Sequence, residues 1–295
     1  MKKYIILTAA LLTVGCQSSS EQVNSLEGQI RVEAILPAST RATATEFEAG
    51  DTMGLYAVEY TESGSVPALQ ISGNYINNEP LTFDGTQWNS ARPLYYSDKA
   101  CDFYAVYPYQ NPKSINTQLF DIVTDQATEP TDGSMGGYEA SDLLWAKTEA
   151  VSYAEGATVP LRFKHLMSRV VVKLERGPKY EGELPDDIVV HLYNTVTTAE
   201  VDYANGSLQS YGMGEKNTIT MKPLAKDEYV AIVVPQHVER KTPLVEITMD
   251  GIAYLLNYSM SFRPGYQHNI TVTLNTSPDQ EKIEISIDGG TGDWN

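Results

Sequence analysis

Apolar side chains recur at every second position in short runs along most of this chain, and a period of two is the pattern of a half-buried β-strand. One such run near the start contains Ile30, Val32, Ala34 and Leu36. Another near the end contains Ile283, Ile285 and Ile287. Gly, Pro, Asn, Asp and Ser separate the runs, and the pair Asp84-Gly85 is a typical hairpin turn. Strands are expected at residues 94–96, 101–107, 160–165 and 170–174, with Leu161 and Phe163 on one face of the third, and Gly177-Pro178 marks a loop after the last of them. Many short strands at this spacing predict an all-β protein built of antiparallel β-sandwiches.

The N-terminus has the three parts of a secretory signal. Lys2 and Lys3 precede an apolar stretch over residues 4–14, which Gly15 and Cys16 follow. The stretch is shorter than the roughly 20 apolar residues of a membrane-spanning helix. A small residue directly before a cysteine resembles the bacterial lipobox, although Thr13 stands where Leu is usual. Residues 1–15 are therefore predicted to be a signal peptide and Cys16 to carry the lipid. The alternative is an ordinary signal peptide with an incidental cysteine.

Charge excludes one class of partner. The formal net charge is −17, and removal of Lys2 and Lys3 from the 21 basic residues leaves 19 against 38 acidic ones, a net charge of −19. Nucleic-acid binding needs a basic surface, so no nucleic-acid partner is expected. Anionic lipid would also repel this surface, so acyl chains are expected to provide the membrane anchor. Hydrophobic residues make up 42% of the chain, enough for a core, and the length fits two domains that divide near residues 165–168.

No arrangement of residues in the sequence indicates catalysis. The Gly-x-Ser-x-Gly and His-Glu-x-x-His motifs and a phosphate-binding glycine loop are absent, and the four histidines are scattered. Cys101 could be a nucleophile or a small buried residue, and its strand context favours burial. Asp288 and Asp293 flank a glycine-rich stretch but lack the spacing of a calcium loop. We therefore predict no enzyme activity, no metal and no cofactor.

A series of motifs resembles one known family in its order along the chain. After the lipobox come Phe47-Glu-Ala-Gly-Asp-Thr-Met-Gly-Leu-Tyr56 and Leu81-Thr-Phe-Asp-Gly-Thr-Gln-Trp88. Then follow Asp102-Phe-Tyr-Ala-Val-Tyr-Pro108, Asp142-Leu-Leu-Trp-Ala146 and Leu161-Arg-Phe-Lys-His-Leu-Met-Ser-Arg-Val170, and Pro264-Gly-Tyr-Gln-His-Asn-Ile-Thr-Val272 with Trp294 ends the series. Together they resemble the fimbrillin-like (Mfa-like) lipoproteins, which are the subunits of type V pili.

The resemblance implies a fold and a mode of assembly. It implies two tandem transthyretin-like (Greek-key) β-sandwiches, which we expect at residues 42–166 and 167–295. It also implies a lipidated propeptide at 16–41 with a strand at 28–36, an outer-membrane precursor exposed at the cell surface, and cleavage by an Arg-specific protease. Arg41 follows that strand in a stretch of small residues and is the expected cleavage site. Loss of Ile30, Val32, Ala34 and Leu36 would open a groove for a strand of another pilin subunit.

Several alternatives stay open at this stage. Arg41 could be an ordinary linker residue. Residues 282–287 could be the strand donated to a neighbour through Ile283, Ile285 and Ile287, or a core strand of a tip or accessory subunit that only receives. With 19 tyrosines in the chain, it could also be a surface lipoprotein that binds glycans or host proteins without polymerising. An extracellular hydrolase lacks any visible nucleophile or metal ligands.

Overall fold

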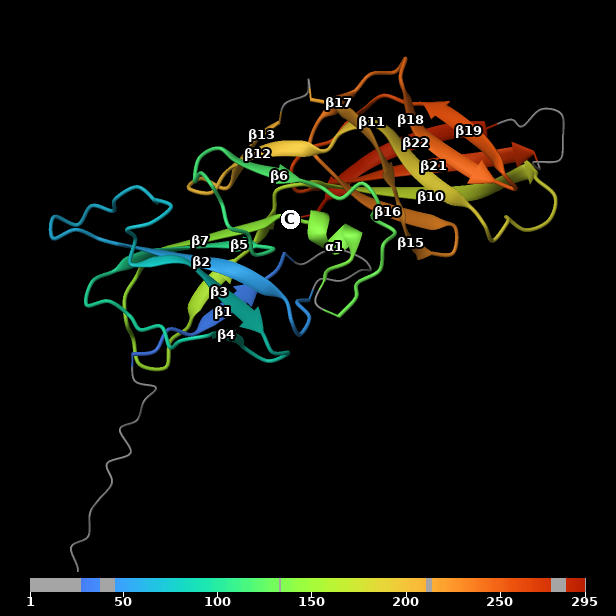
Figure 1. Cartoon of the computed structure of the whole chain (residues 1–295). Helices are drawn as coiled ribbons and strands as arrows, with labels where there is room; N and C mark the ends of the chain where they lie inside the picture. Colours follow the sequence, from blue (N-terminus) through green and yellow to red (C-terminus); the bar gives the residue numbers. More distant parts are fainter. Residues whose placement is uncertain (1–27, 38–45, 133, 211–213, 277–284, 295) are drawn as a thin grey trace, which may run out of the picture.

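The computed structural model describes residues 28–37, 46–132, 134–210, 214–276 and 285–294. The regular secondary structure of these residues is β-strand except for one short helix, α1 (Gly137–Ser141), so the all-β prediction is confirmed. No helix in the described ranges has the length and apolar character of a membrane span. Figure 1 shows two halves, one coloured blue to green and the other yellow to red, with α1 and the C-terminus between them. The transthyretin-like topology of each half stays a prediction.

The first half is built on a six-stranded antiparallel sheet. Its order is β4 (Trp88–Ser90), β3 (Ile76–Phe83), β2 (Thr52–Glu59), β5 (Cys101–Tyr107), β7 (Leu144–Val151) and β9 (Lys164–His165). The hairpin between β3 and β4 turns at Asp84-Gly85, as the sequence predicts. The Asp84 side chain accepts the backbone N–H groups of Thr86 and Gln87, and Gly85 has a φ of 96°, which favours glycine.

Both faces of this six-stranded sheet are covered. Side chains alternate along β2 and β5, so that Leu55 and Phe103 lie in one buried cluster while Tyr56 and Tyr104 lie in another. The first cluster belongs to the first half alone, and the N-terminal segment packs against it. The second cluster continues into the second half of the chain.

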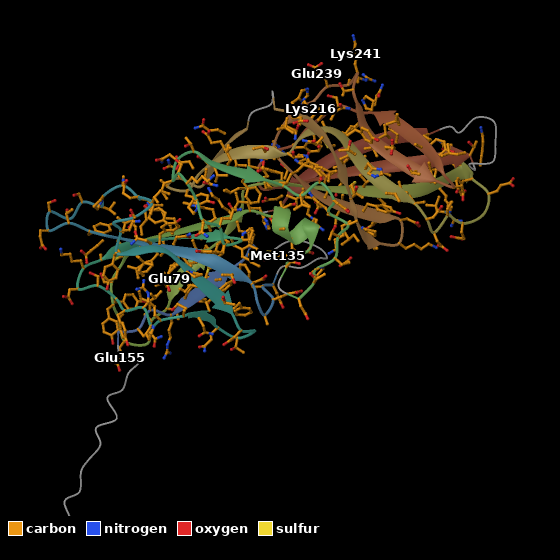
Figure 2. The ribbon with its side chains drawn as sticks, in the orientation of Figure 1. Glu79, Met135, Glu155, Lys216, Glu239 and Lys241 are labelled. Atoms are coloured by element: carbon orange, nitrogen blue, oxygen red, sulfur yellow. The ribbon has the colours of Figure 1, made fainter. Side chains whose placement is uncertain are left out.

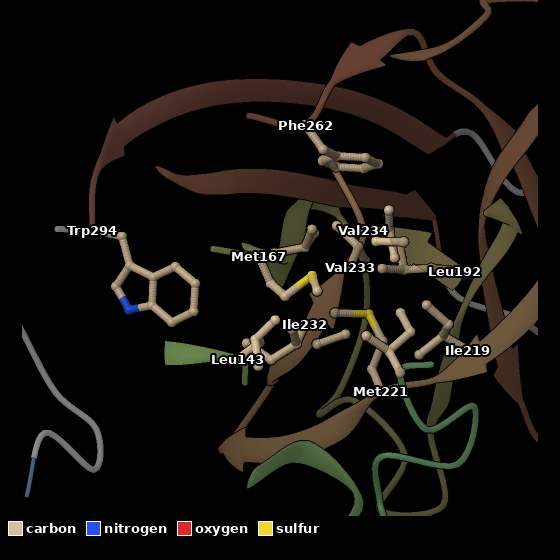
Figure 3. Packing of buried hydrophobic residues seen from close by; sticks show 14 of the residues in the cluster. Leu143, Met167, Leu192, Ile219, Met221, Ile232, Val233, Val234, Phe262 and Trp294 are labelled. Atoms are coloured by element: carbon tan, nitrogen blue, oxygen red, sulfur yellow. The ribbon is translucent and has the colours of Figure 1, made fainter. Parts of the chain in front are cut away.

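The second half has two larger sheets. One is five-stranded in the order β15 (Lys222–Ala225), β16 (Glu228–Val233), β10 (Ser168–Lys179), β21 (Tyr266–Thr276), β22 (Ile285–Asp293). The other is four-stranded in the order β14 (Lys216–Thr220), β11 (Val189–Val196), β18 (Pro243–Met249), β19 (Ile252–Asn257). A short pair, β17 (His237–Val238) and β20 (Met260–Ser261), lies beside them. Figure 3 shows the core, in which Leu192, Ile219 and Val233 pack together.

The second half differs from the sequence expectation in two respects. β10 and β21 pair in parallel, because the many residues between them allow the crossover that a parallel pair requires. β10 also continues through Gly177-Pro178, where the sequence suggests a loop. The register shifts between Arg176 and Lys179, so the proline occupies an irregular point of the ladder rather than ending the strand.

The two halves share a third sheet and a common core. β6 (Gln118–Asp121), from the first half, pairs with β12 (Thr198–Asp202), which in turn pairs with β13 (Ser207–Ser210). The Trp145 indole N–H donates to the carbonyl of Tyr203 at 2.7 Å, and the Trp145 ring covers Gly206. The halves are therefore joined by the β6–β12 ladder, by a side-chain hydrogen bond and by apolar packing.

Candidate strand-acceptor site

The segment at residues 28–37 lies between two other parts of the first half. β1 (Val32–Ile35) pairs in parallel with β8 (Val159–Arg162), so that Ala34 lies opposite Leu161. Immediately before β1, Gln29 forms an antiparallel bridge with Tyr95. The segment thus links β8 to the chain that follows β4, and Figure 1 shows β1, β3 and β4 on the same side of the first half.

The side chains of this segment alternate between the core and solvent. Ile30 is 8% exposed, and Val32, Ala34 and Leu36 are half-buried against the same cluster. Arg31 and Glu33, between them, are exposed. Full burial of an aliphatic side chain contributes about 1.5–3 kcal/mol, so these partly buried residues hold the segment by only a few such increments.

Beneath the segment lie some of the most deeply buried residues of the first half. Val159 and Leu161 have no exposed surface, and Phe163 is 4% exposed. The backbone N–H groups of Val159 and Phe163 donate to carbonyls of the segment, at Arg31 and Ile35, with distances of 2.7 and 2.8 Å. Loss of the segment would expose this apolar surface and leave those N–H donors unpaired, which is the property of a strand acceptor.

The C-terminal end of the segment enters a cavity between the halves. Leu36 and Pro37 line this space of about 340 Å³ together with Phe47, Tyr107 and Trp294. Several polar groups around it are paired. The Tyr107 hydroxyl donates to Asp51 at 2.9 Å, His165 contacts Asp142 at 2.9 Å, and Lys222 contacts Glu139 at 2.8 Å. Burial, and then the charge of Asp51, raises the pKa of Tyr107, so its phenol stays neutral and donates.

The C-terminal strand β22 lies at the edge of the five-stranded sheet. It pairs antiparallel with β21, with Ile285 opposite Leu274 and Ile287 opposite Val272. Both isoleucines are partly buried against the larger core. Of residues 282–287, only 285–287 are described, and they lie in this strand, which continues to Asp293. Trp294 follows it, is 5% exposed, and donates its backbone N–H to the carbonyl of Gly265 at 3.1 Å.

Three residues to which the sequence assigns a role lie outside the described residues. These are Cys16, Arg41 and Ile283. The cysteine that is described, Cys101, is 2% exposed, and burial raises the pKa of its thiol to about 11. A neutral buried thiol of this kind is a packing residue rather than a nucleophile.

The structure also shows how the histidines and the C-terminal aspartates are arranged. Within the described ranges, no three His, Cys, Asp or Glu side chains are grouped so that they could hold an ion. His191 contacts Glu246 at 3.1 Å, and His268 accepts the Arg263 backbone N–H at 3.0 Å. Asp288 and Asp293 are five positions apart on β22, so their backbones are about 16 Å apart and could not share a calcium ion.

Sequence reasoning did not identify the walls of the acceptor site. Leu161 and Phe163 were expected on one strand face, but nothing indicated that this strand would pair with β1 rather than with its neighbour in sequence. Residues 94–96 make only an isolated bridge, where the sequence predicts a strand. The contact between Phe47 and Trp88, at 4.9 Å between ring centroids, joins residues 41 positions apart and leaves no periodic signal.

The chain is similar to proteins of fimbriae and of cell adhesion. Residues 40–294 match the family described as fimbrillin-like. A Bacteroides ovatus protein named as a fimbrium tip subunit, Fim1C, is 30% identical over 210 aligned positions, and the match covers 59% of this chain and 36% of that protein. The chain therefore spans about a third of the length of that curated relative.

Two solved structures named for cell adhesion match in fold. The Bacteroides uniformis structure has a TM-score of 0.64 at 19% identity and covers 91% of this chain and 98% of its own. The Bacteroides ovatus structure has a TM-score of 0.66 at 15% identity, and the match covers 90% of this chain and 98% of that one.

Proposed function

This chain belongs to the fimbrillin-like family, and we propose that it is a structural subunit of a fimbrium that receives a strand from another subunit. The proteins to which it is similar are named as fimbrial or cell adhesion proteins, not as enzymes. The received strand replaces residues 28–37. The observation that carries the proposal is the placement of β1, which pairs with β8 and covers Leu161 and Phe163 but is itself only half-buried. Arg41 follows four residues after Pro37, so a single cut separates this strand from the rest of the chain.

The proposal gives Cys16 and Arg41 successive roles. Acylation of Cys16 brings the precursor to the outer membrane. Cleavage after Arg41 then breaks the covalent link between residues 42–295 and the lipidated N-terminal segment, so that another strand can replace β1. The acyl chains serve for delivery, and the mature subunit is held by its neighbours in the fimbrium instead.

The C-terminal strand supports a position at the end of the fimbrium. Donation of β22 to another subunit would break its antiparallel ladder with β21 and remove Trp294 from a buried site. We therefore propose that Ile285 and Ile287 belong to the subunit's own edge strand. A subunit that receives a strand without donating one is a tip or accessory subunit, and the name of the similar Bacteroides ovatus protein agrees with this position.

The test is cleavage followed by strand binding. Treatment of the precursor with an Arg-specific protease should release residues 42–295, and an Arg41→Ala chain should resist. The trimmed chain should then bind a synthetic peptide of residues 28–37 and form complexes with partner subunits that withstand SDS. Because it does not donate a strand, it should not polymerise alone. A trimmed chain that neither takes up the peptide nor joins a partner contradicts the proposal.

Exposed tyrosines favour a second candidate, a surface protein that binds glycans or host proteins without polymerising. Tyr75, Tyr95 and Tyr153 are 44%, 46% and 42% exposed, and all three lie in the first half. Aromatic faces in solvent suit contacts with sugars and proteins. Under this reading the uncut chain binds a glycan array, and alanine at these tyrosines removes the binding, while Arg41→Ala changes nothing.

A further inference from the structure

A groove runs along β1 on the side away from β8. One wall is formed by residues 29–34 and the other by the β3–β4 hairpin, with Phe83, Trp88 and Asn89. Its volume is about 650 Å³, and a smaller space of about 110 Å³ continues it toward Pro93 and Leu94. We propose that this β1–β4 groove is the place where an incoming strand from another fimbrial subunit first docks, while β1 is still bound. The inference rests on the proposed function. It adds the groove in which the incoming strand first binds and the order in which the two strands exchange.

The first and second parts of the N-terminal segment form backbone hydrogen bonds on opposite sides of the segment. Its first part bonds to residues 94–96, since Ile30 N–H donates to the carbonyl of Leu94 at 2.8 Å. Its second part bonds to β8 on the opposite side, where the carbonyls of Arg31 and Ile35 accept. Backbone groups of successive residues point to alternate sides of a strand. The N–H and C=O groups of Val32 and Ala34 therefore face the groove, and no described strand pairs with β1 on that side.

The opposite wall also presents free backbone groups. β4 is the last strand of the six-stranded sheet, so one of its edges has no partner among the described strands. The Asp84 N–H donates to the Gln87 carbonyl at 3.0 Å, which makes Thr82 and Asn89 the next hydrogen-bonded pair. The N–H and C=O groups of Trp88 and Ser90 then point outward, away from β3. Two facing edges with unused donors and acceptors form a slot for an extended chain.

The side chains of the groove indicate the kind of strand that fits. Phe83 and Trp88 lie 5.2 Å apart between ring centroids and form an aromatic wall opposite Val32 and Ala34. Thr86, Gln87 and Asn89 add neutral polar groups, while the charges of Arg31 and Glu33 on the other wall are opposite in sign. The groove therefore suits an extended segment of a neighbouring subunit with apolar side chains at alternate positions and no particular charge.

Docking beside β1 changes the kinetics of strand replacement. If β1 had to leave first, the rate would equal its spontaneous release and would not depend on the incoming strand. If the incoming strand binds the groove first, it gains backbone bonds to β4 before those of β1 are lost. The observed rate then rises with the concentration of the incoming strand.

The experiment uses a full chain with a specific protease sequence inserted between Pro37 and Glu46, cut so that the N-terminal segment stays bound. A fluorescent peptide of residues 28–37 is added at increasing concentration, and its uptake is followed by anisotropy. We expect a rate that rises linearly with peptide. Gln87→Trp, which places an indole in the groove from an exposed turn, should lower that slope about tenfold while the spontaneous release rate changes less than twofold. Lys241→Trp, far away on the second half (Figure 2), is the matched control and should behave as the unmodified chain.

A rate independent of peptide concentration overturns the inference, as does an unchanged slope in Gln87→Trp. The proposed function is judged separately, with the cut chain refolded after removal of its N-terminal segment. If that chain binds the peptide but the intact complex exchanges only at the spontaneous rate, strand acceptance stands and the docking groove fails. If the refolded chain does not bind the peptide, the proposed function fails, and the inference with it.

Discussion

The Trp294 indole lies stacked on the His165 imidazole, with ring centroids 3.6 Å apart and planes 17° from parallel. His165 ends β9 in the first half, and Trp294 directly follows the last strand of the second. The stack therefore fixes one end of β22 at the junction of the two halves, beside the cavity that Leu36 and Pro37 enter. Both terminal strands of the described chain meet at this junction.

Replacement of Trp294 should loosen this junction. Truncation of a buried Trp to Ala typically costs 3–5 kcal/mol, so we expect Trp294→Ala to lower the free energy of unfolding by about 3 kcal/mol in urea titrations. Trp294→Phe retains a ring on His165 and should lose less. Limited proteolysis should then cut Trp294→Ala within β22 sooner than the unmodified chain. Equal losses for the two variants would show that stacking contributes nothing.

Gly206 should tolerate no side chain. Its φ is 57°, and a Cβ there would lie 2.2 Å from a ring atom of Trp145. Overpacking and left-handed backbone together predict a loss of about 2–4 kcal/mol for Gly206→Ala. The matched control is Gly251→Ala, which has a φ of 76° but no neighbour within 4 Å, so it should lose only about 1 kcal/mol. Urea unfolding measures both, and similar losses would contradict close packing of Trp145 on Gly206.

The strands could be predicted from the sequence because the alternation and turn residues that indicate them are local. Alternation and turn residues placed β5 at Cys101–Tyr107 and the hairpin at Asp84-Gly85. The parallel pairing of β10 with β21 was missed, since it joins Arg169 to Gln267 and depends on which sheets pack together. The continuation of β10 past Pro178 was missed because the proline is accommodated by a register shift set by β21.

The candidate site also combines features that are local in the sequence with contacts between distant elements. The alternation of Ile30, Val32, Ala34 and Leu36 is local and indicates which face of the segment is apolar. Its partners are not local, since β8 lies more than 120 residues away and reaches β1 only through the folded sheet. The buried stack of Trp294 on His165 likewise has no sequence periodicity. Such contacts come from packing between distant elements, which a single sequence does not encode in a readable pattern.

Cys101 should be unreactive in the folded chain. Its thiol is buried and its pKa is raised to about 11, so little thiolate exists at pH 8. In a Cys16→Ser chain, where Cys101 is the remaining cysteine, a thiol reagent should react at least 100-fold more slowly than in the same chain unfolded in urea. Rapid modification of the folded chain would mean that β5 is more accessible than its burial indicates.

His268 should make stability depend on pH. Burial, and then the charge of Arg263, lowers the pKa of His268 to about 4, whereas the unfolded chain titrates near 6.5. Between these values only the unfolded chain binds the proton, so stability is full above pH 6.5 and falls as the pH drops toward 4. The expected decrease in the free energy of unfolding over this pH range is about 3 kcal/mol. His268→Gln should show a shallower decline over the same range in urea titrations at fixed ionic strength, and an identical decline would contradict the assignment.

Ile30 should hold the N-terminal segment more strongly than its neighbours. It is the most deeply buried residue of the segment, while the adjacent Arg31 is exposed. Ile→Ala truncation in a core costs 2–5 kcal/mol, and the low end applies at the margin of a cluster. Ile30→Ala should therefore lower the free energy of unfolding by about 2 kcal/mol, whereas Arg31→Ala should change it by no more than about 0.5 kcal/mol. In a chain cut between Pro37 and Glu46, 2 kcal/mol corresponds to roughly 30-fold faster release of the segment, because 1.4 kcal/mol is a factor of ten. Equal release rates for the two variants would mean that backbone pairing with β8, rather than the apolar face, retains the strand.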